Sequence, residues 1–326
     1  MENAGSMSSS EIHLGPHGRL SSIINPNKGP IMKPFLALVF PIVLLFCGCV
    51  QETLPTLEQA AAVTEIKKLG GLVTLNELGE VTQVTLWSTQ LTDEGLEHLK
   101  GLTSLTYLYL EDTKITDAGL EHLKGLTSLN ALHLSGSQIT GVGLKHLKGL
   151  SKLNTLNLLR TKITDAELEH LKGMTSLDIL YLGETQITDT GLQHLKGLTS
   201  LTHLSLNGTQ VTDAGLEHLK DVTSLNILHL SDTQITDAGL ENLKGLTSLN
   251  RLHLRNTQIT DAGLVHLKDL TGLRHLYLED TQVTDAGLEH LKGMTSLKTL
   301  YLNDTQITDA GLSELKAALP NCDVIE

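Results

Sequence analysis

Histidine has the most evident chemical potential in this 326-residue chain, which contains 15 of them. Imidazole binds metals and transfers protons near neutral pH. One set recurs at multiples of 24 residues and is interrupted only by Asn242: His98, His122, His146, His170, His194, His218, His266 and His290. Stacked at roughly 5 Å per layer, these side chains would be close enough to share a metal ion. A metal site needs convergent ligands, however, and a stack presents parallel ones, so we expect a duplicated, half-packed surface residue and no metal.

The other residue types that could carry catalysis are also repeated rather than singular. Serine, histidine and aspartate are plentiful, but no nucleophile stands apart together with a base and an orienting partner. The sequence has no P-loop, no glycine-rich dinucleotide motif and no HExxH metal motif. A hydrolase would need a singular acid/base pair. We therefore expect a non-enzymatic protein with no catalytic residue and no cofactor.

A strict 24-residue period sets the position of all these residues. The stretch 102–125, LTSLTYLYLEDTKITDAGLEHLKG, starts again every 24 residues, and a weaker first copy begins at Leu78, which gives ten repeats over 78–317. Leu108 and Leu110 alternate with polar or aromatic residues, as in a strand with one buried face. A single copy cannot bury its own leucines, each of which stabilises the fold by roughly 1.5–3 kcal/mol when buried. Stacking of the copies must therefore form the core.

The second half of each copy predicts a short helix. Leu120 and Leu123 have helical spacing, Thr116 is a typical N-cap residue, and Gly125 is expected to end the helix in the left-handed conformation. Thr113 recurs as Thr or Ser in every copy. If it is buried, its hydroxyl must bond to neighbouring backbone.

The pattern L-x-x-L-x-L-x-x-T-x-I-T-D-A-G-L-x-x-L resembles the leucine-rich repeat, with Thr where that family usually has Asn or Cys. The resemblance implies an α/β fold, a right-handed solenoid or horseshoe with a parallel sheet on the concave face and short helices on the convex face. Bacterial secreted and lipoprotein members with T-D-A-G-L repeats are similar. So are F-box substrate receptors, although no segment here resembles an F-box. The family implies a binding scaffold but does not identify the ligand.

The segment before the repeats predicts export. Residues 1–31 are polar and aperiodic, which indicates disorder or a true start at Met32 instead of Met1. Residues 32–49, MKPFLALVFPIVLLFCGC, have the layout of a signal peptide, and LFCGC resembles a bacterial lipobox with Cys49 as the lipidated residue. An uncleaved signal anchor is the alternative, since the apolar run is near the short limit for a membrane span. Both readings place the repeats on the periplasmic or extracellular side of a membrane, held by a lipid or by the anchor.

Covers are expected at both ends of the stack. Residues 50–77 predict an N-terminal cap, with a helix over 57–69 and a strand over 72–75. Residues 318–326 predict a C-terminal cap in which Leu319, Cys322 and Ile325 continue the leucine spacing.

Two further properties narrow the chemistry. Cys322 is expected to replace a core leucine, with no disulfide, once Cys47 is removed with the signal segment. The net charge of −13 argues against nucleic acid as a partner.

The positions that point away from the core on each strand are the informative ones for function. All five tyrosines and the single tryptophan of the sequence fall on them. The predicted ligand-binding face consists of Trp87, Tyr107, Tyr109, His133, Asn157, Tyr181, His203, His229, Arg251, His253, His275, Tyr277 and Tyr301. These positions vary between copies whereas core positions hardly do, and amphipathic rings suit recognition. The alternative is that Tyr and Thr simply favour strands.

The carboxyl-terminal half of this face is expected to be locally positive, because His229, His253 and His275 lie near Arg251. With an imidazole pKa near 6.5, binding would change between about pH 5.5 and 7.5; a metal held by these histidines is a further alternative. The sequence thus predicts a scaffold for a protein or glycan ligand. An adaptor subunit of an enzyme complex and a structural envelope protein are the other readings.

Overall fold

The computed structural model describes residues 57–326, in which an open sheet of 12 strands runs in chain order. The first two strands are antiparallel, and each later strand is parallel to the one before it. The strands are β1 (Leu72–Leu75), β2 (Val81–Thr85), β3 (Tyr107–Tyr109), β4 (Ala131–His133), β5 (Thr155–Asn157), β6 (Ile179–Tyr181), β7 (His203–Ser205), β8 (Ile227–His229), β9 (Arg251–His253), β10 (His275–Tyr277), β11 (Thr299–Tyr301) and β12 (Asp323–Ile325).

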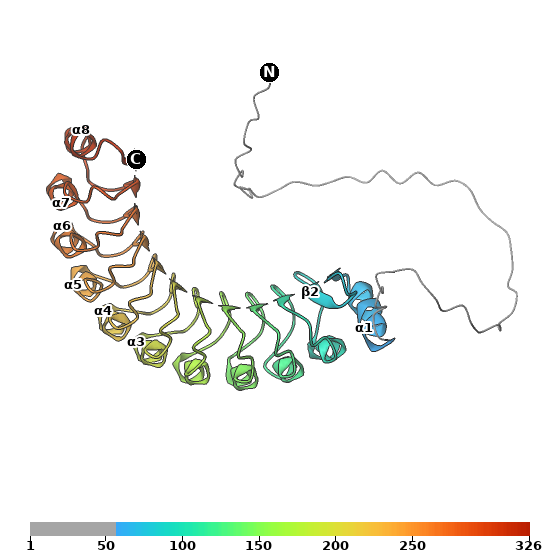
Figure 1. Ribbon diagram of the computed structural model, residues 1–326. Coiled ribbons are helices and arrows are strands. Elements are labelled where there is room, and N and C mark those ends of the chain that lie inside the picture. The colour runs from blue at the N-terminus through green and yellow to red at the C-terminus, as the bar shows by residue number, and fades with distance from the viewer. Residues whose placement is uncertain (1–56) are drawn as a thin grey trace, which may run out of the picture. The chain divides into compact units, whose positions relative to one another are not determined.

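Short helices form the outer layer of the arc and the strands form its inner layer (Figure 1). The α-helices are α1 (Leu57–Lys68), α2 (Asp93–Leu96), α3 (Asp189–Leu192), α4 (Asp213–Leu216), α5 (Asp237–Glu241), α6 (Asp261–Leu264), α7 (Asp285–Leu291) and α8 (Asp309–Ala318). The 3₁₀ segments are η1 (Glu97–Leu99), η2 (Gly119–Leu123), η3 (Val142–Leu147), η4 (Asp165–Leu171), η5 (Gln193–Leu195), η6 (Glu217–Leu219) and η7 (Val265–Leu267). A convex helix is wider than a strand, so the layers curve away from the helical side. The predicted solenoid is confirmed.

The core is built from equivalent leucines of successive repeats. Leu108 pairs with Leu132 across β3 and β4, and both side chains are fully buried. The buried hydroxyl of Thr113 donates to the carbonyl of Leu110 at 2.8 Å, and the equivalent residues of the other repeats make the same bond. The predicted backbone partner of this hydroxyl is therefore confirmed, and it lies three residues earlier in the same repeat.

Left-handed backbone occurs at the predicted helix end in only one described repeat, at Gly173, whose φ is +87°. Gly125 does not have a positive φ, and Asp221 and Asp269 replace it in other repeats. The turn that leaves each concave strand is the left-handed position, with φ +53° at Asp112 and +67° at Gly136. There the chain reverses from the sheet toward the convex side. Short polar residues and glycine tolerate this conformation, and most repeats have one of them.

A ladder of aspartates joins all but one of the repeats to the next and was not foreseen from the sequence. Asp93 accepts from the backbone N–H of Thr116 at 2.7 Å and from its hydroxyl at 2.6 Å. The same pair of bonds links Asp213 to Thr236. The glycine of the T-D-A-G-L motif faces this carboxylate, and a Cβ on Gly119 would collide with Asp93 Oδ1. Aspartate and glycine in the motif are thus two sides of one contact between repeats.

The repeats are covered at both ends. Helix α1 buries Ile66 against the first repeat and ends before Gly70, whose φ is +84°. At the other end, β12 keeps the 24-residue register, so that Val324 lies opposite Leu300 and packs on the core. The leucine spacing predicted that Ile325 would point into the core. This prediction was wrong: Ile325 lies beside Tyr301 and is 38% exposed.

Cys322 packs partly on the core, as predicted, and burial raises the pKa of its thiol.

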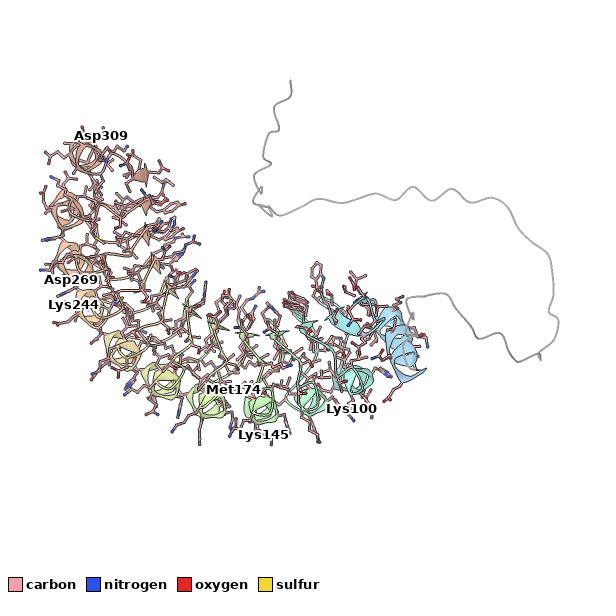
Figure 2. All side chains as sticks on the ribbon, viewed as in Figure 1. Lys100, Lys145, Met174, Lys244, Asp269 and Asp309 are labelled. Atoms are coloured by element: carbon pink, nitrogen blue, oxygen red, sulfur yellow. The ribbon has the colours of Figure 1, made fainter. Side chains whose placement is uncertain are left out.

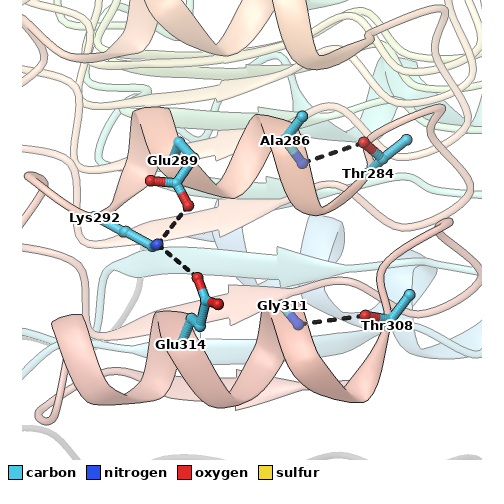
Figure 3. Close-up of polar contacts among 7 residues, drawn as sticks. All are labelled: Thr284, Ala286, Glu289, Lys292, Thr308, Gly311 and Glu314. Carbon is cyan, nitrogen blue, oxygen red and sulfur yellow. Dashed lines mark hydrogen bonds and ion pairs between the residues drawn. The ribbon is translucent and has the colours of Figure 1, made fainter.

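The convex surface is solvated and charged. Figure 2 shows Lys100, Lys145 and Lys244 on the helical side of the arc. Lysine and glutamate pair at i,i+3 on this surface. One lysine also links two helices: Lys292 contacts Glu289 of α7 and Glu314 of α8, the latter at 3.0 Å (Figure 3). Figure 3 also shows Thr284 and Thr308 capping these two helices through their hydroxyls.

The predicted signal segment, Cys49 and residues 1–31 lie outside the described residues. Within 57–326, none of the helices has the length and apolar character needed to cross a membrane.

Candidate ligand-binding face

Three columns of side chains cover the concave face. The first column contains the residues equivalent to Tyr107, the central column those equivalent to Tyr109, and the third column those equivalent to Glu111. Every residue predicted for the ligand-binding face lies on it and outside the core, because strand alternation turns its neighbours inward. Trp87 in the third column and Tyr107 in the first are the most open, at 61% and 41% exposed. Ligand binding by these residues stays a prediction.

Rings of the central column stack on one another in the last repeats. His229 lies 4.1 Å from His253, His253 lies 3.7 Å from Tyr277, and Tyr277 lies 4.4 Å from Tyr301, measured between ring centroids. The rings are within 13° of parallel. Parallel strands in register place equivalent side chains one strand spacing apart, which is the separation that stacked rings need. We call these four residues the ring ladder.

A shorter stack joins Tyr109 to His133 at 4.8 Å near the other end of the face. Between the two stacks the central column has Asn157, Tyr181 and Ser205. Asn157 accepts from the backbone N–H of Leu159 at 3.0 Å, so part of its side chain is used within its own repeat. Ser205 is only 5% exposed. The middle of the face is therefore poorer in rings that project into solvent.

The imidazoles of the ring ladder are neutral at physiological pH. Burial, with the nearby charge of Arg251, lowers the pKa of His229 to about 4. Burial, with His229 and Arg251, lowers the pKa of His253 to about 3. The expectation that these rings titrate near 6.5 was therefore wrong, because stacking in adjacent repeats removes them from water. Burial also lowers the pKa of His275, ahead of the effects of Arg251 and Arg274.

Positive charge at this end of the face therefore comes from arginine. The Nε of Arg255 is 3.0 Å from Asp280, which offsets its charge. Arg251 makes no ion pair among the described residues, and its Nε is shielded from solvent without a hydrogen-bond partner. A shielded guanidinium nitrogen without a hydrogen-bond partner favours an incoming acceptor.

A hollow lies at the amino-terminal end of the face. It has a volume of about 450 Å³ and is lined by Trp87, Tyr109 and Glu111, among others. Burial raises the pKa of Glu111, whose Oε1 is 3.5 Å from His133 Nδ1. Sequence reasoning missed Glu111, although its place in the same column as Trp87 could have indicated it.

The residues of 57–326 include no cluster of three or more potential metal ligands. The convex histidines are half-buried for the most part, and His122, His170 and His218 each have a shielded Nδ1 without a hydrogen-bond partner. This half-packed state matches the expectation for a duplicated surface residue.

Comparisons with known proteins agree with the geometry. The family described as leucine rich repeat matches residues 80–139, 127–187, 151–211 and 223–283, and a two-copy form of it matches 271–321. The chain is similar to the solved structure of internalin C2 from Listeria monocytogenes, with 30% identity, a TM-score of 0.53 and coverage of 71% of this chain and 94% of that one. It is also similar to a leucine-rich-repeat protein of Leptospira interrogans, with 24% identity, a TM-score of 0.57 and coverage of 71% and 57%. No curated protein matches the chain. The matched family covers most of the repeats, and the chain therefore belongs to the leucine-rich-repeat family.

Proposed function

We propose that this protein is a non-enzymatic scaffold whose concave sheet holds a protein ligand. One observation carries the proposal: all five tyrosines and the only tryptophan of the chain lie on this one face. Tyrosine and tryptophan offer a large contact area with a polar tip, and their few rotatable bonds keep the entropic cost of binding low. The helical face has glutamate–lysine pairs in the same register positions, which suit a solvated surface.

Absence of catalysis is part of the proposal. Eleven of the 13 histidines in residues 57–326 are half-buried. Those of the ring ladder are neutral, so they can donate or accept hydrogen bonds without changing charge. The repeated polar residues of the convex side are used in contacts within and between repeats. Asp93, for example, binds the backbone and hydroxyl of Thr116.

The proposal also includes tethering outside the cytoplasm. It rests on the signal-like segment 32–49 and on Cys49 in its lipobox-like context. A glycan ligand, an adaptor role in an enzyme complex and a purely structural envelope role are the competing functions. A glycan would use the same rings for stacking, so the identity of the captured molecule decides between them.

The experiment is capture from an envelope extract with the full chain in non-ionic detergent. Two variants are compared with the parent: a concave one with Tyr181, His229, His253 and Tyr277 replaced by Ser, and a convex one with four histidines replaced by Ser. The convex set is His146, His170, His194 and His218. We expect the concave variant to lose the captured protein and the convex variant to keep it. Equal capture by both variants would contradict the assignment of the binding face.

A further inference from the structure

The hollow at the amino-terminal end of the face has two open aromatic walls. Trp87 is 61% exposed, and Tyr109 stacks on His133 on one side only. Its volume of about 450 Å³ is within the range of pockets that hold small groups, roughly 300–1,000 Å³. Glu111 also lines it. Two aromatic rings and a carboxylate therefore face one space.

The carboxylate of Glu111 has no cation to match it. Its nearest partner is His133, with Nδ1 at 3.5 Å from Oε1, but burial lowers the pKa of that imidazole and keeps it neutral. Its Oε2 is shielded from solvent and has no hydrogen-bond partner. Arg160 also lines the hollow, and its guanidinium is 3.9 Å from Asp112, where it offsets a different carboxylate. One partly desolvated negative charge is left over.

A second repeat has a glutamate at the equivalent position. Glu279 occupies the same column as Glu111, and its Oε2 is also shielded without a hydrogen-bond partner. In the repeat before it, the third column has Arg255, whereas in the repeat before Glu111 it has Trp87. Arg255 forms its ion pair with Asp280, and its charge also acts on Glu279, whereas the equivalent position before Glu111 holds an open aromatic ring.

We propose that the hollow between Trp87, Tyr109 and Glu111 receives the cationic end of a lysine or arginine side chain from the protein ligand. The inference rests on the proposed function, since it assigns one contact of the same concave face. An ammonium or guanidinium over an aromatic ring is attracted by the ring's negative face, and a neighbouring carboxylate adds charge pairing. A chain of net charge −13 also steers basic segments toward its surface.

Trp87 is the only tryptophan in the chain, so its fluorescence reports on the hollow directly. The full chain in non-ionic detergent is titrated with Nα-acetyl-lysine methylamide at low salt, with the uncharged norleucine analogue and methyl α-glucoside as comparisons. We expect a saturable change in Trp87 emission with the lysine compound alone. Glu111→Gln should weaken this binding about tenfold, and Glu111→Lys should abolish it by placing a cation of the chain in the hollow. The matched variant Glu279→Gln should leave it unchanged.

Several results would overturn the inference. The first is that the parent binds the lysine and norleucine compounds equally well. The second is that Glu111→Gln, with an unchanged circular dichroism spectrum, binds the lysine compound as tightly as the parent does. The others are a response to the glucoside but not to the lysine compound, and no response to any compound. None of them bears on capture of a protein by the rest of the face, which the pull-down tests separately.

Discussion

The one repeat boundary that departs from the aspartate ladder allows a direct test of how the repeats are joined. Gly141 stands where every other complete repeat has the aspartate. In the repeat that follows, Glu167 stands where the other repeats have the glycine. Glu167 Oε2 accepts from the backbone N–H of Thr164 at 3.2 Å and from its hydroxyl at 2.6 Å. At this boundary, the carboxylate that accepts hydrogen bonds from the threonine thus comes from the threonine's own repeat instead of from the preceding one.

Each single reversal should destabilise the protein. Glu167→Gly leaves the N–H and the hydroxyl of the partly buried Thr164 without their acceptor, which costs about 1–3 kcal/mol. Gly141→Asp puts a side chain on a residue with φ +108°, a strained conformation that costs about 1–3 kcal/mol. The new Cβ would also lie 2.7 Å from Cβ and Cγ of Glu167, so this variant should be the worse of the two.

The double variant should recover most of the loss. It removes the side chain with which the new aspartate collides. Residue 141 can then adopt the negative φ of the equivalent Asp213, which holds Thr236 while Gly239 makes room. If the singles cost about 2 kcal/mol each and the double less than about 1 kcal/mol, the coupling energy is about 3 kcal/mol, at the upper end for residues in contact. Urea unfolding of the four proteins measures it, with equal m-values as the check that unfolding stays cooperative. Additive losses would refute the idea that one carboxylate per boundary serves this threonine.

Three other outcomes follow from the structure. Leu204→Ala in the core should cost about 2–5 kcal/mol through the cavity it leaves, whereas Glu217→Ala on the convex face should change the free energy of unfolding by less than about 0.5 kcal/mol; equal shifts in urea melts would contradict the inside and outside assignments. The imidazoles of His229 and His253 should titrate near 4 and 3 by NMR. Because histidine in the unfolded chain binds its proton near pH 6.5, the free energy of unfolding should be highest above pH 6.5 and fall as the pH drops toward 4. His253→Phe should reduce this fall. Cys49→Ser should abolish acylation and partitioning into the detergent phase; unchanged partitioning would favour a signal anchor.

The core and the parallel direction of the strands in the repeats could be predicted from the sequence because both follow from the 24-residue period. The antiparallel direction of β1, in the cap, could not. Leu108 recurs in register, and the sheet pairs it with its copies. The aspartate ladder could not be seen in the same way, because the partners of Asp117 lie in the next repeat and the local pattern indicates only a helix start. The exchange at Gly141 and Glu167 is the one sequence feature that indicates a contact there. The left-handed turn was misplaced because Gly125 was preferred over the column of Asp112, although short polar residues also adopt this conformation.

The protonation state of the concave histidines could not be predicted from the sequence, for a related reason. Nothing in one repeat shows that the ring of His253 will have both faces covered, by His229 and by Tyr277. Once both faces are covered, only the edge of the ring meets a ligand, and edges recognise hydrogen-bonding groups. Trp87 has no ring stacked on it among the described residues and lies 61% exposed, so its face is open to a cation or an apolar group. The two ends of one regular sheet therefore differ in recognition chemistry because of how far the stacking of rings extends.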